Sequence, residues 1–365
     1  MIGIQRVNMA FIGLTTIVKA RLQGSSKFIK GFSTSTLPTD DKPINHFVPC
    51  LESDITSEMV SSFHHDIRKS LNCDAIVVGS GLSGLSCVYH MLQLGEKLKM
   101  DRPPKITLIE KSFRPGGNGW AGTSFFNSVV VRKPAHHLLE SLGVSYQNRN
   151  DKYVVLKNGI ELTSKLLNYV SSHSNVSIFT GYEANEILLT SPNDSFSPVR
   201  GVAVAFGGDS NSNGNNVSNS TNTNMTPLYF NTETVVCCSG SQPASSSGLR
   251  QNLRRYSTWG WADMPLDHTA KTTSHPPTDV QQAEDYMVSS TREVSNGLFV
   301  AGSELCWLDG CAQSGPTVGG RLQSGLIAAQ LAMKHIEKAR DRKETRSIGL
   351  ETASHFLHDD TLETV

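Results

Sequence analysis

Hydrophobic residues in the first third of the chain alternate between short apolar runs and helical spacing. Residues 75–78 form an apolar run typical of a buried parallel strand, and Leu85, Val88 and Leu92 then recur on one face of a helix. A second apolar run covers residues 106–109. A strand, a helix and a strand in this order predict a βαβ unit with a parallel sheet.

A glycine-rich turn joins the first predicted strand to the helix. Gly79, Gly81 and Gly84 have the GxGxxG spacing: the first glycine makes a tight turn, the second admits a pyrophosphate, and the third lets the helix pack closely. The second strand ends at Glu110, whose carboxylate can accept hydrogen bonds from ribose hydroxyls. A charged insertion at residues 95–104 places this acid later than the usual distance of about 20 residues. GxGxxG alone occurs in many loops, but this combination predicts nucleotide binding.

The pattern after Glu110 continues the alternation of helices and strands. Helices are predicted at residues 57–71, 135–142 and 162–171, and strands at 153–156, 176–179, 184–189, 199–206 and 234–238. Residues 128–137 are predicted to be a strand or a turn that leads into the second helix. A second strand, glycine loop and helix follow at residues 297–339. The predicted fold class is α/β, a Rossmann-like fold of the two-dinucleotide-binding-domain flavoprotein type. In such folds we expect the C-terminal unit to close over the nucleotide.

The two ends of the chain differ in composition from the predicted domain at residues 73–339. Residues 1–38 are basic, rich in Ser and free of acidic side chains, which favours a mitochondrial transit peptide over the alternative, a disordered tail on a cytoplasmic protein. Residues 39–72 form a lead-in with one helix. We expect the Asn- and Ser-rich insertion at 207–224 to be disordered, and residues 340–365 to be a polar tail.

Composition narrows the class of partners. The 365 residues are 38% hydrophobic and 18% charged and carry no net formal charge, so neither nucleic acid nor a membrane is the expected main partner. The N-terminal apolar run is shorter than the roughly 20 residues that span a bilayer. The seven cysteines form no CxxC pair and no zinc-type spacing, which indicates reduced thiols.

Several short motifs together resemble the thiamine thiazole synthase family, from about Cys73 to Ile336. The motifs are Pro115-Gly116-Gly117, Val131-Arg132-Lys133-Pro134-Ala135-His136, Ala283-Glu284-Asp285, Thr291-Arg292-Glu293-Val294, Leu308-Asp309-Gly310 and Gly315-Pro316-Thr317. The resemblance implies a Rossmann-type enzyme that binds NAD and glycine and makes an adenylated thiazole, the thiazole precursor of thiamine. It also implies sulfur from a protein cysteine or from free sulfide with Fe(II), and a homo-oligomer, commonly an octamer.

The resemblance further implies a set of nucleotide-binding residues. Gly79, Gly81 and Gly84 would hold the pyrophosphate region, and Glu110 would accept from the ribose. The other positions are Ser83 at an adenylate contact, Lys111 beside Glu110, Gly117 and Asn118 in the glycine turn that touches the ligand, and Ala184 near the adenine.

This sequence departs from the family pattern at the positions that the resemblance assigns to chemistry. The sulfur-donor cysteine aligns with Asn224, and the two metal ligands align with Thr226 and Ser241. The arginine that would bind the glycine carboxylate aligns with Gln313, and a substrate-binding methionine aligns with Ser303. Asn224 has no thiolate to donate sulfur, and neutral hydroxyls are poor ligands for iron.

Other cysteines and histidines are alternative candidates for the sulfur donor, the metal ligands and contacts with the bound ligand. Cys237 and Cys238 end a predicted strand, a position that favours packing over reactivity. Cys306 and Cys311 lie near the predicted ligand end, and packing is again favoured over a role at the ligand. His136 and His137 open a predicted helix, which favours a role at the helix start or in the core over metal binding.

Three functions stay open at this point. The first is a thiazole synthase-type enzyme that binds NAD and glycine. The second is a catalytically silent paralogue that has kept the nucleotide pocket and lost sulfur transfer, as the substitutions suggest. The third is an FAD-dependent oxidoreductase with the same fold, which the family motifs oppose.

Overall fold

The structure is a computed structural model that describes most of the chain. The described residues are 48–120, 127–191, 194, 197–206, 227–240, 249, 253, 279–309, 311, 315 and 317–359, with side chains described as far as 345. Contacts divide the chain into two compact units, Met1–Ser57 and Glu58–Val365. The predicted transit peptide and the predicted disordered insertion lie outside the described residues.

The centre of the second unit is a six-stranded sheet with the order β11-β12-β10-β1-β2-β6. Its strands are β1 (Ala75–Val78), β2 (Ile106–Glu110), β6 (Val176–Thr180), β10 (Val235–Cys237), β11 (Arg292–Ser295) and β12 (Leu298–Val300). All neighbours are parallel except β11 and β12. The carboxyl ends of β1, β2, β10 and β12 therefore meet at one edge of the sheet, which we call the carboxyl edge.

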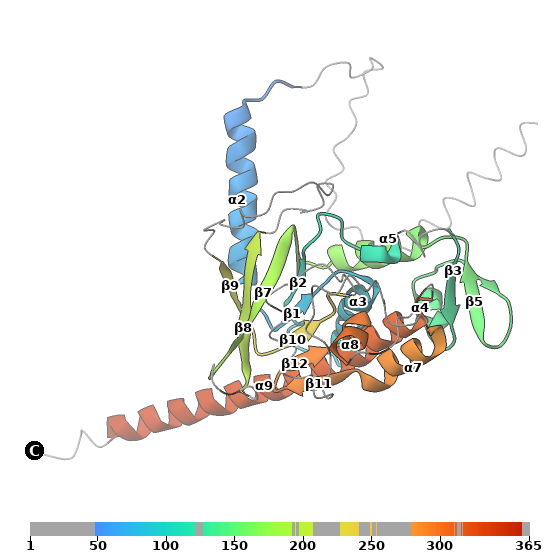
Figure 1. Cartoon of the computed structure of the whole chain (residues 1–365). Coiled ribbons are helices and arrows are strands. Elements are labelled where there is room, and N and C mark those ends of the chain that lie inside the picture. The colour runs from blue at the N-terminus through green and yellow to red at the C-terminus, as the bar shows by residue number, and fades with distance from the viewer. Residues whose placement is uncertain are drawn as a thin grey trace, which may run out of the picture. The chain divides into compact units, whose positions relative to one another are not determined.

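The two faces of the central sheet are covered by different layers. Ala75 and Val77 of β1 pack into a core formed with helices α3 (Leu82–Lys97), α5 (Ile160–Ser171) and α9 (Gly319–Asp359). Ile76 and Val78 face the other way, toward the antiparallel sheet β7 (Tyr182–Leu189), β8 (Val199–Phe206) and β9 (Leu228–Asn231). Because both faces are buried, β1 reads as a continuous apolar run. Figure 1 shows the central sheet between these layers.

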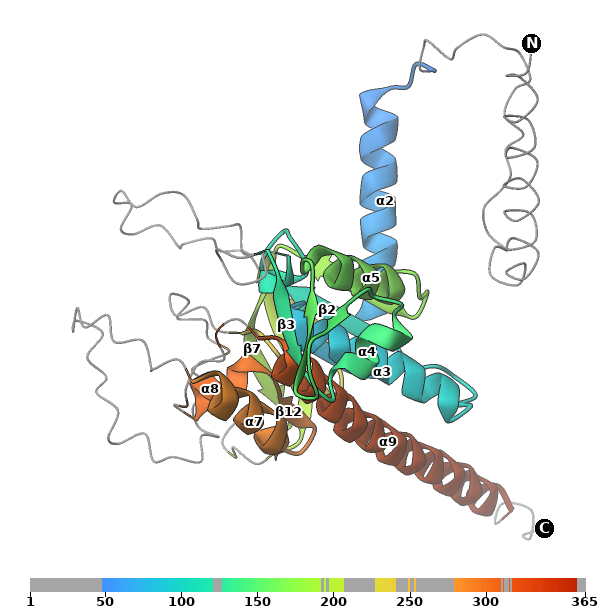
Figure 2. The same ribbon diagram turned by 90° about the vertical axis from the view of Figure 1, so that its right-hand side faces the viewer.

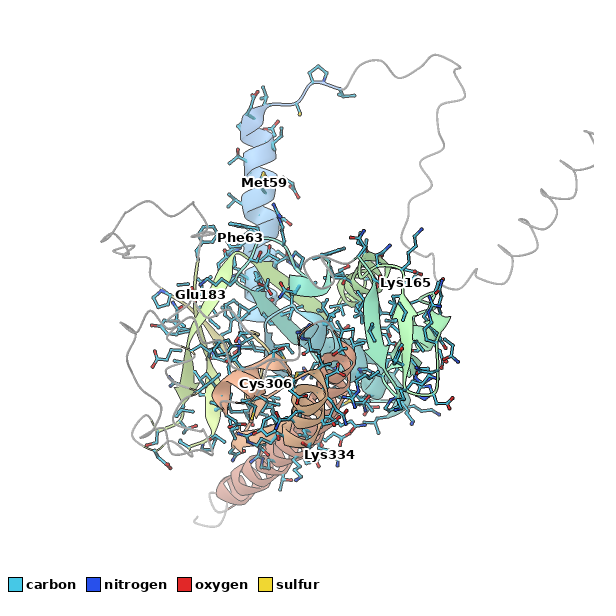
Figure 3. All side chains as sticks on the ribbon, turned by 45° about the vertical axis from the view of Figure 1, so that its right-hand side comes forward. Met59, Phe63, Lys165, Glu183, Cys306 and Lys334 are labelled. Atoms are coloured by element: carbon cyan, nitrogen blue, oxygen red, sulfur yellow. The ribbon has the colours of Figure 1, made fainter. Side chains whose placement is uncertain are left out.

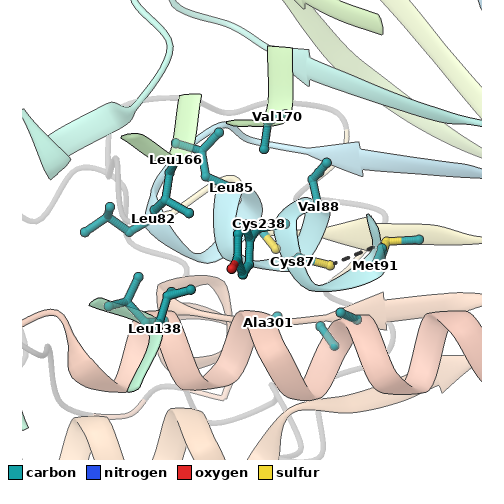
Figure 4. Packing of buried hydrophobic residues seen from close by; sticks show 14 of the residues in the cluster. Leu82, Leu85, Cys87, Val88, Met91, Leu138, Leu166, Val170, Cys238 and Ala301 are labelled. Carbon is teal, nitrogen blue, oxygen red and sulfur yellow. Dashed lines mark hydrogen bonds between the residues drawn. The ribbon is translucent and has the colours of Figure 1, made fainter. Parts of the chain in front are cut away.

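Helix α3 is the centre of the helical layer. Its residues Leu85 and Val88 share a buried cluster with Leu166 and Val170 of α5, as Figure 4 shows. Helix α9 lies along α3, and Figure 2 shows it continuing past the sheet. This close approach depends on small residues: a Cβ on Gly325 of α9 would lie 2.4 Å from the carbonyl oxygen of Ser83.

A small third sheet joins the middle of the chain to the C-terminal loop. It contains β3 (Val129–Arg132), β4 (Gln147–Asn148) and β5 (Tyr153–Leu156), and helix α4 (His136–Ser141) follows β3. Val130 of β3 forms an isolated bridge with Thr317, and the Val318 N–H donates to the Val130 carbonyl. The turn after β3 therefore lies against the start of α9.

The structure confirms the predicted α/β class and corrects several boundaries. The lead-in helix, α2 (Glu52–Ser70), begins before residue 57. Helices α7 (Val280–Ser290) and α8 (Ser303–Leu308) and strands β9 and β11 were not predicted. The segment predicted as a polar tail, residues 340–365, continues α9 as far as Asp359.

The extension of α9 has a simple cause. Residues 340–344 are Arg, Asp, Arg, Lys and Glu, most of which have good helix propensity, so this segment needs no apolar face to stay helical. None of the helices in the described part of the chain has the length and apolar character needed to cross a membrane.

Candidate nucleotide-binding site

The glycine-rich turn after β1 has the geometry that its sequence predicts. Gly79 has φ 96°, and a Cβ on it would lie 2.5 Å from the Cys238 carbonyl oxygen. A Cβ on Gly84 would lie 1.9 Å from the Gly79 carbonyl oxygen. These two positions therefore require glycine for the turn and for the approach of α3 to β1.

Gly81 differs from the other two glycines because the space beside it is open. It precedes α3 in an extended conformation, with φ −64° and ψ 178°, and a Cβ there would meet no atom within 4 Å. The first turn of α3 contains no acidic side chain, and no side chain caps it. Free N–H groups at a helix start favour an anion, so this open side is where a pyrophosphate fits.

Glu110 at the end of β2 is bonded to the glycine turn. Its Oε2 accepts from the Ser80 backbone N–H and from the Ser80 hydroxyl, both at 2.7 Å, and its Oε1 accepts from the Ser112 N–H at 2.9 Å. A carboxylate has about four lone-pair positions. We therefore expect binding of two ribose hydroxyls to require the Ser80 hydroxyl to rotate away. Sequence reasoning did not find this role of Ser80.

The second glycine turn lies against the first. Gly116 and Gly117 have φ 108° and 52°, and a Cβ on Gly117 would come within 3.2 Å of the Gly81 Cα. The Gly116 N–H also reaches the Ser80 hydroxyl oxygen at 3.1 Å. Asn118 is exposed in the short 3-10 helix Gly117–Gly119. The structure therefore brings the predicted residues Gly81, Gly117 and Asn118 to one part of the carboxyl edge.

Lys111 and Ala184 are brought together from different sheets. The Lys111 ammonium lies 3.1 Å from the Glu183 carboxylate on β7, and Ala184 is the next residue on that strand. Figure 3 labels Glu183 at the antiparallel sheet. Ala184 is buried, so its side chain supports the strand. Its predicted contact with adenine stays a prediction.

The C-terminal strand, loop and helix pack against the start of α3; their predicted closure over a nucleotide stays a prediction. A Cβ on Gly302 would lie 2.2 Å from the Ser83 hydroxyl, and the Ser86 hydroxyl donates to the Leu322 carbonyl at 2.7 Å. Ser83 is consequently buried beneath Gly302. The structure places Ser83 where the N-terminal and C-terminal strand-loop-helix segments meet; its predicted contact with adenylate stays a prediction.

The half-buried guanidinium of Arg321 lies beside Ser303. Arg321 at the start of α9 donates from Nε to the Ser303 hydroxyl at 3.1 Å, and its Nη2 is 3.5 Å from the Gly315 carbonyl. Burial lowers the pKa of Arg321, and the nearby Glu284 carboxylate opposes this shift. Sequence reasoning missed Arg321, although a single cation after Gly319 and Gly320 in an otherwise uncharged loop is a visible signal.

The remaining substituted positions are not in the described part of the chain. Gln313, Asn224, Thr226 and Ser241 all fall outside the described residues. Ser303 is described, and its contact with Arg321 places it at the amino end of α8.

The charged residues of the family motifs form buried ion pairs. Arg292 binds Asp309 through two N–H groups, each at 2.9 Å, and the Tyr286 hydroxyl donates to the same carboxylate at 2.7 Å. Arg132 lies 3.3 Å from Glu284, whose other oxygen accepts from the Gly320 N–H at 2.8 Å. These bonds join α7 and α8 to the loop that carries Arg321. The motifs therefore support the C-terminal half of the site.

The cysteines near the site are buried thiols. Cys237 and Cys238 are buried, as the packing interpretation predicted, and burial raises the pKa of both thiols. Burial also raises the pKa of Cys306 to about 12, and Figure 3 shows this residue inside the C-terminal half. A thiol with a raised pKa is rarely a thiolate at neutral pH, so none of these three has the character of a nucleophile.

These features define a Rossmann-type α/β protein with an open glycine-rich turn at the carboxyl edge of its sheet. The model of the Thi4 family matches residues 56–318, and this chain belongs to that family. The assignment favours a thiazole synthase-type protein over the FAD-dependent oxidoreductase.

Known relatives agree with this assignment. The thiamine thiazole synthase of Chlamydomonas reinhardtii, named as chloroplastic, is 30% identical over 315 residues, which cover 85% of this chain and 81% of that protein. The enzyme of the same name from Aspergillus oryzae is 31% identical over 290 residues, covering 79% of this chain and 82% of that protein. The crystal structure of THI4 from Thermovibrio ammonificans shares the fold, with a TM-score of 0.61 and 22% identity over 80% of this chain and 100% of that chain.

Proposed function

We propose that this protein makes an adenylated thiazole, the thiazole precursor of thiamine, from NAD and glycine. The observation that carries the proposal is the carboxyl edge: Gly81, Glu110 and Gly117 surround the open start of α3 in a member of the Thi4 family. Backbone N–H groups there suit the pyrophosphate, and the Glu110 carboxylate suits the ribose.

The sulfur atom is proposed to come from free sulfide and not from a cysteine of the protein. A sulfur donor needs a thiolate, and burial opposes this state in the four cysteines considered for this role, Cys237, Cys238, Cys306 and Cys311. The positions that the resemblance assigns to Fe(II) ligands are Thr226 and Ser241, whose neutral hydroxyls do not fit this ion. We therefore assign no step to iron.

Arg321 is proposed to bind the carboxylate of glycine in place of the arginine that Gln313 replaces. Its guanidinium contacts the hydroxyl of Ser303, which is itself an aligned substrate position. Arg is the side chain best suited to a carboxylate, because its N–H groups match both oxygens.

The test is mass spectrometry of the purified full-length protein. The intact mass is measured, and small molecules released on denaturation are identified after incubation with NAD, glycine and sulfide, with and without Fe(II). An adenylated thiazole with an unchanged protein mass supports the proposal. A protein fraction lighter by one hydrogen sulfide would show a cysteine donor instead. Bound NAD or ADP-ribose without any thiazole product would favour the catalytically silent paralogue.

The role of Arg321 is tested by replacing it with methionine. Hydrogen bonds to a charged group contribute about 1.5–3 kcal/mol, so Arg321→Met should raise the glycine concentration for half-maximal product formation roughly 10- to 100-fold. NAD binding should change little. Lys334→Met is the matched control, because Lys334 is an exposed cation on the same helix. An equal glycine requirement in both variants would remove Arg321 from the site.

The location and assembly of the protein are separate proposals. The basic, acid-free residues 1–38 support mitochondrial import, whereas the plant and algal relatives from Vitis vinifera and Chlamydomonas reinhardtii are named as chloroplastic. Imaging of a fluorescent protein fused behind residues 1–38 distinguishes the compartments. Light scattering of the purified protein tests the proposed homo-oligomer.

A further inference from the structure

Two histidines and a glutamate converge at the start of α4. The Nε2 of His136 lies 4.0 Å from one oxygen of Glu140, and the Nδ1 of His137 lies 3.1 Å from the other. One ligand atom from each of the three residues lies within 4.8 Å of the other two. The short sequence spacing places all three on the short helix α4, which follows β3.

Neighbouring groups hold two of these side chains in the orientation that a metal ligand needs. The Nδ1 of His136 is 3.2 Å from the Pro134 carbonyl oxygen, so an N–H there donates and leaves the lone pair of Nε2 facing Glu140. The Tyr146 hydroxyl donates to Glu140 Oε1 at 2.7 Å. Hydrogen bonds of this kind orient the ligands in protein metal sites.

We propose that His136, His137 and Glu140 bind a divalent transition-metal ion, with Zn²⁺ as the best fit. Two imidazoles and a carboxylate suit Zn²⁺ better than Mg²⁺ or Ca²⁺, and water can take the fourth position. Bonds of about 2.0–2.1 Å place tetrahedral ligand atoms about 3.3 Å apart. The His137 side chain is 69% exposed and can rotate to shorten the longer separations.

The ion would strengthen α4, which follows the strand that touches the C-terminal loop. That strand, β3, bridges to Thr317, and a Cβ on Gly319 would lie 2.9 Å from the backbone nitrogen of Arg132 at its end. An ion that binds only the folded chain raises its stability. The expected effect is therefore structural, and it does not depend on the proposed thiazole synthesis.

The chain contains a matched control for this site. His64, His65 and Asp66 on α2 are also exposed and consecutive, with two imidazoles and a carboxylate. They are not among the convergent groups found in the described residues. Comparing Zn²⁺ binding by variants at the two clusters therefore shows whether binding requires the converging arrangement of the side chains or only the presence of two histidines and a carboxylate.

The experiment is calorimetric titration of the untagged, metal-free, full-length protein with Zn²⁺. We expect His137→Ala and Glu140→Gln to lose one equivalent of binding or weaken it at least tenfold, and Tyr146→Phe to weaken it about tenfold. His65→Ala should bind like the unsubstituted protein. Zn²⁺ should raise the melting temperature of the unsubstituted protein and of His65→Ala, but not of His137→Ala.

Two results would overturn the proposal. One is the absence of Zn²⁺ binding to the unsubstituted protein. The other is equal binding by the unsubstituted protein and His137→Ala, which would place any bound ion elsewhere, for example on a cysteine. His137 and Glu140 are exposed, so their variants are expected to fold, and circular dichroism checks this.

Discussion

Alanine substitution at two glycines of the same turn should have different consequences: one variant should lose stability, and the other should lose affinity for the nucleotide. At Gly84 a Cβ would lie 1.9 Å from the Gly79 carbonyl oxygen, so α3 must move away from β1. Overpacking of this kind typically costs about 1–3 kcal/mol, and we expect the upper end because the obstacle is backbone. Gly84→Ala should therefore lower the free energy of unfolding by about 3 kcal/mol.

Gly81→Ala should leave the fold intact and weaken nucleotide binding. The φ and ψ of Gly81 suit an L-residue, and no atom lies within 4 Å of the new Cβ. Reduced freedom of the unfolded chain stabilises by about 0.4–1 kcal/mol, and loss of a favoured N-cap residue costs about 1 kcal/mol or less. The net change in stability should stay within about 1 kcal/mol. The methyl group would occupy the space expected for the pyrophosphate, so affinity for NAD should fall at least tenfold, or about 1.4 kcal/mol.

Urea denaturation measures the stability of both variants, and calorimetric titration with NAD and with ADP-ribose measures affinity. The pair is informative because each variant adds the same methyl group within one turn of the other. Wild-type affinity in Gly81→Ala would refute the placement of the pyrophosphate at the start of α3. A stable Gly84→Ala protein would instead contradict the described packing of α3.

Three further predictions concern stability and reactivity. Asp309→Asn removes the carboxylate from the buried pair with Arg292 and should cost about 3 kcal/mol in urea denaturation; a change under about 1 kcal/mol would contradict the described pair. Burial lowers the pKa of His335, so below about pH 6.5 the unfolded chain binds a proton that the folded chain does not. Stability should therefore fall as the pH drops below about 6.5, less steeply in His335→Gln, and equal slopes would exclude this histidine. Iodoacetamide at pH 8 should alkylate the exposed Cys50 quickly and the buried Cys238 only after unfolding, as peptide mass mapping would show; fast labelling of Cys238 would revive it as a sulfur donor.

The nucleotide unit could be predicted from sequence because its determinants are local. Apolar residues 75–78, the three glycines and Glu110 lie within one short segment, and their order and spacing form a pattern that the sequence shows directly. The hydrogen bonds between Ser80 and Glu110 were not predictable in the same way. They depend on the distance between two strand ends, which the sequence pattern does not contain.

The C-terminal half was harder to predict because charged residues form part of its core. Helix α7 buries Glu284, and α8 is followed by the buried Asp309, so hydrophobic periodicity does not mark these segments. Both carboxylates can be buried because arginines neutralise them, Arg132 at Glu284 and Arg292 at Asp309. Arg321 differs from these residues, because the sequence marks it as a lone cation, but its contact with Ser303 is not contained in the sequence pattern.

The roles of the motif residues bear on how family membership should be interpreted. Arg132, Glu284, Arg292 and Asp309 match the family pattern, and in the structure each forms an ion pair that holds the C-terminal half together. Matches at these positions therefore report the fold, which a protein without activity would need equally. The positions that depart from the pattern are those that the resemblance assigns to sulfur, metal and carboxylate. Mass spectrometry of the thiazole product and the glycine requirement of Arg321→Met consequently test the reaction directly. Further matches to the family motifs would only support the fold again.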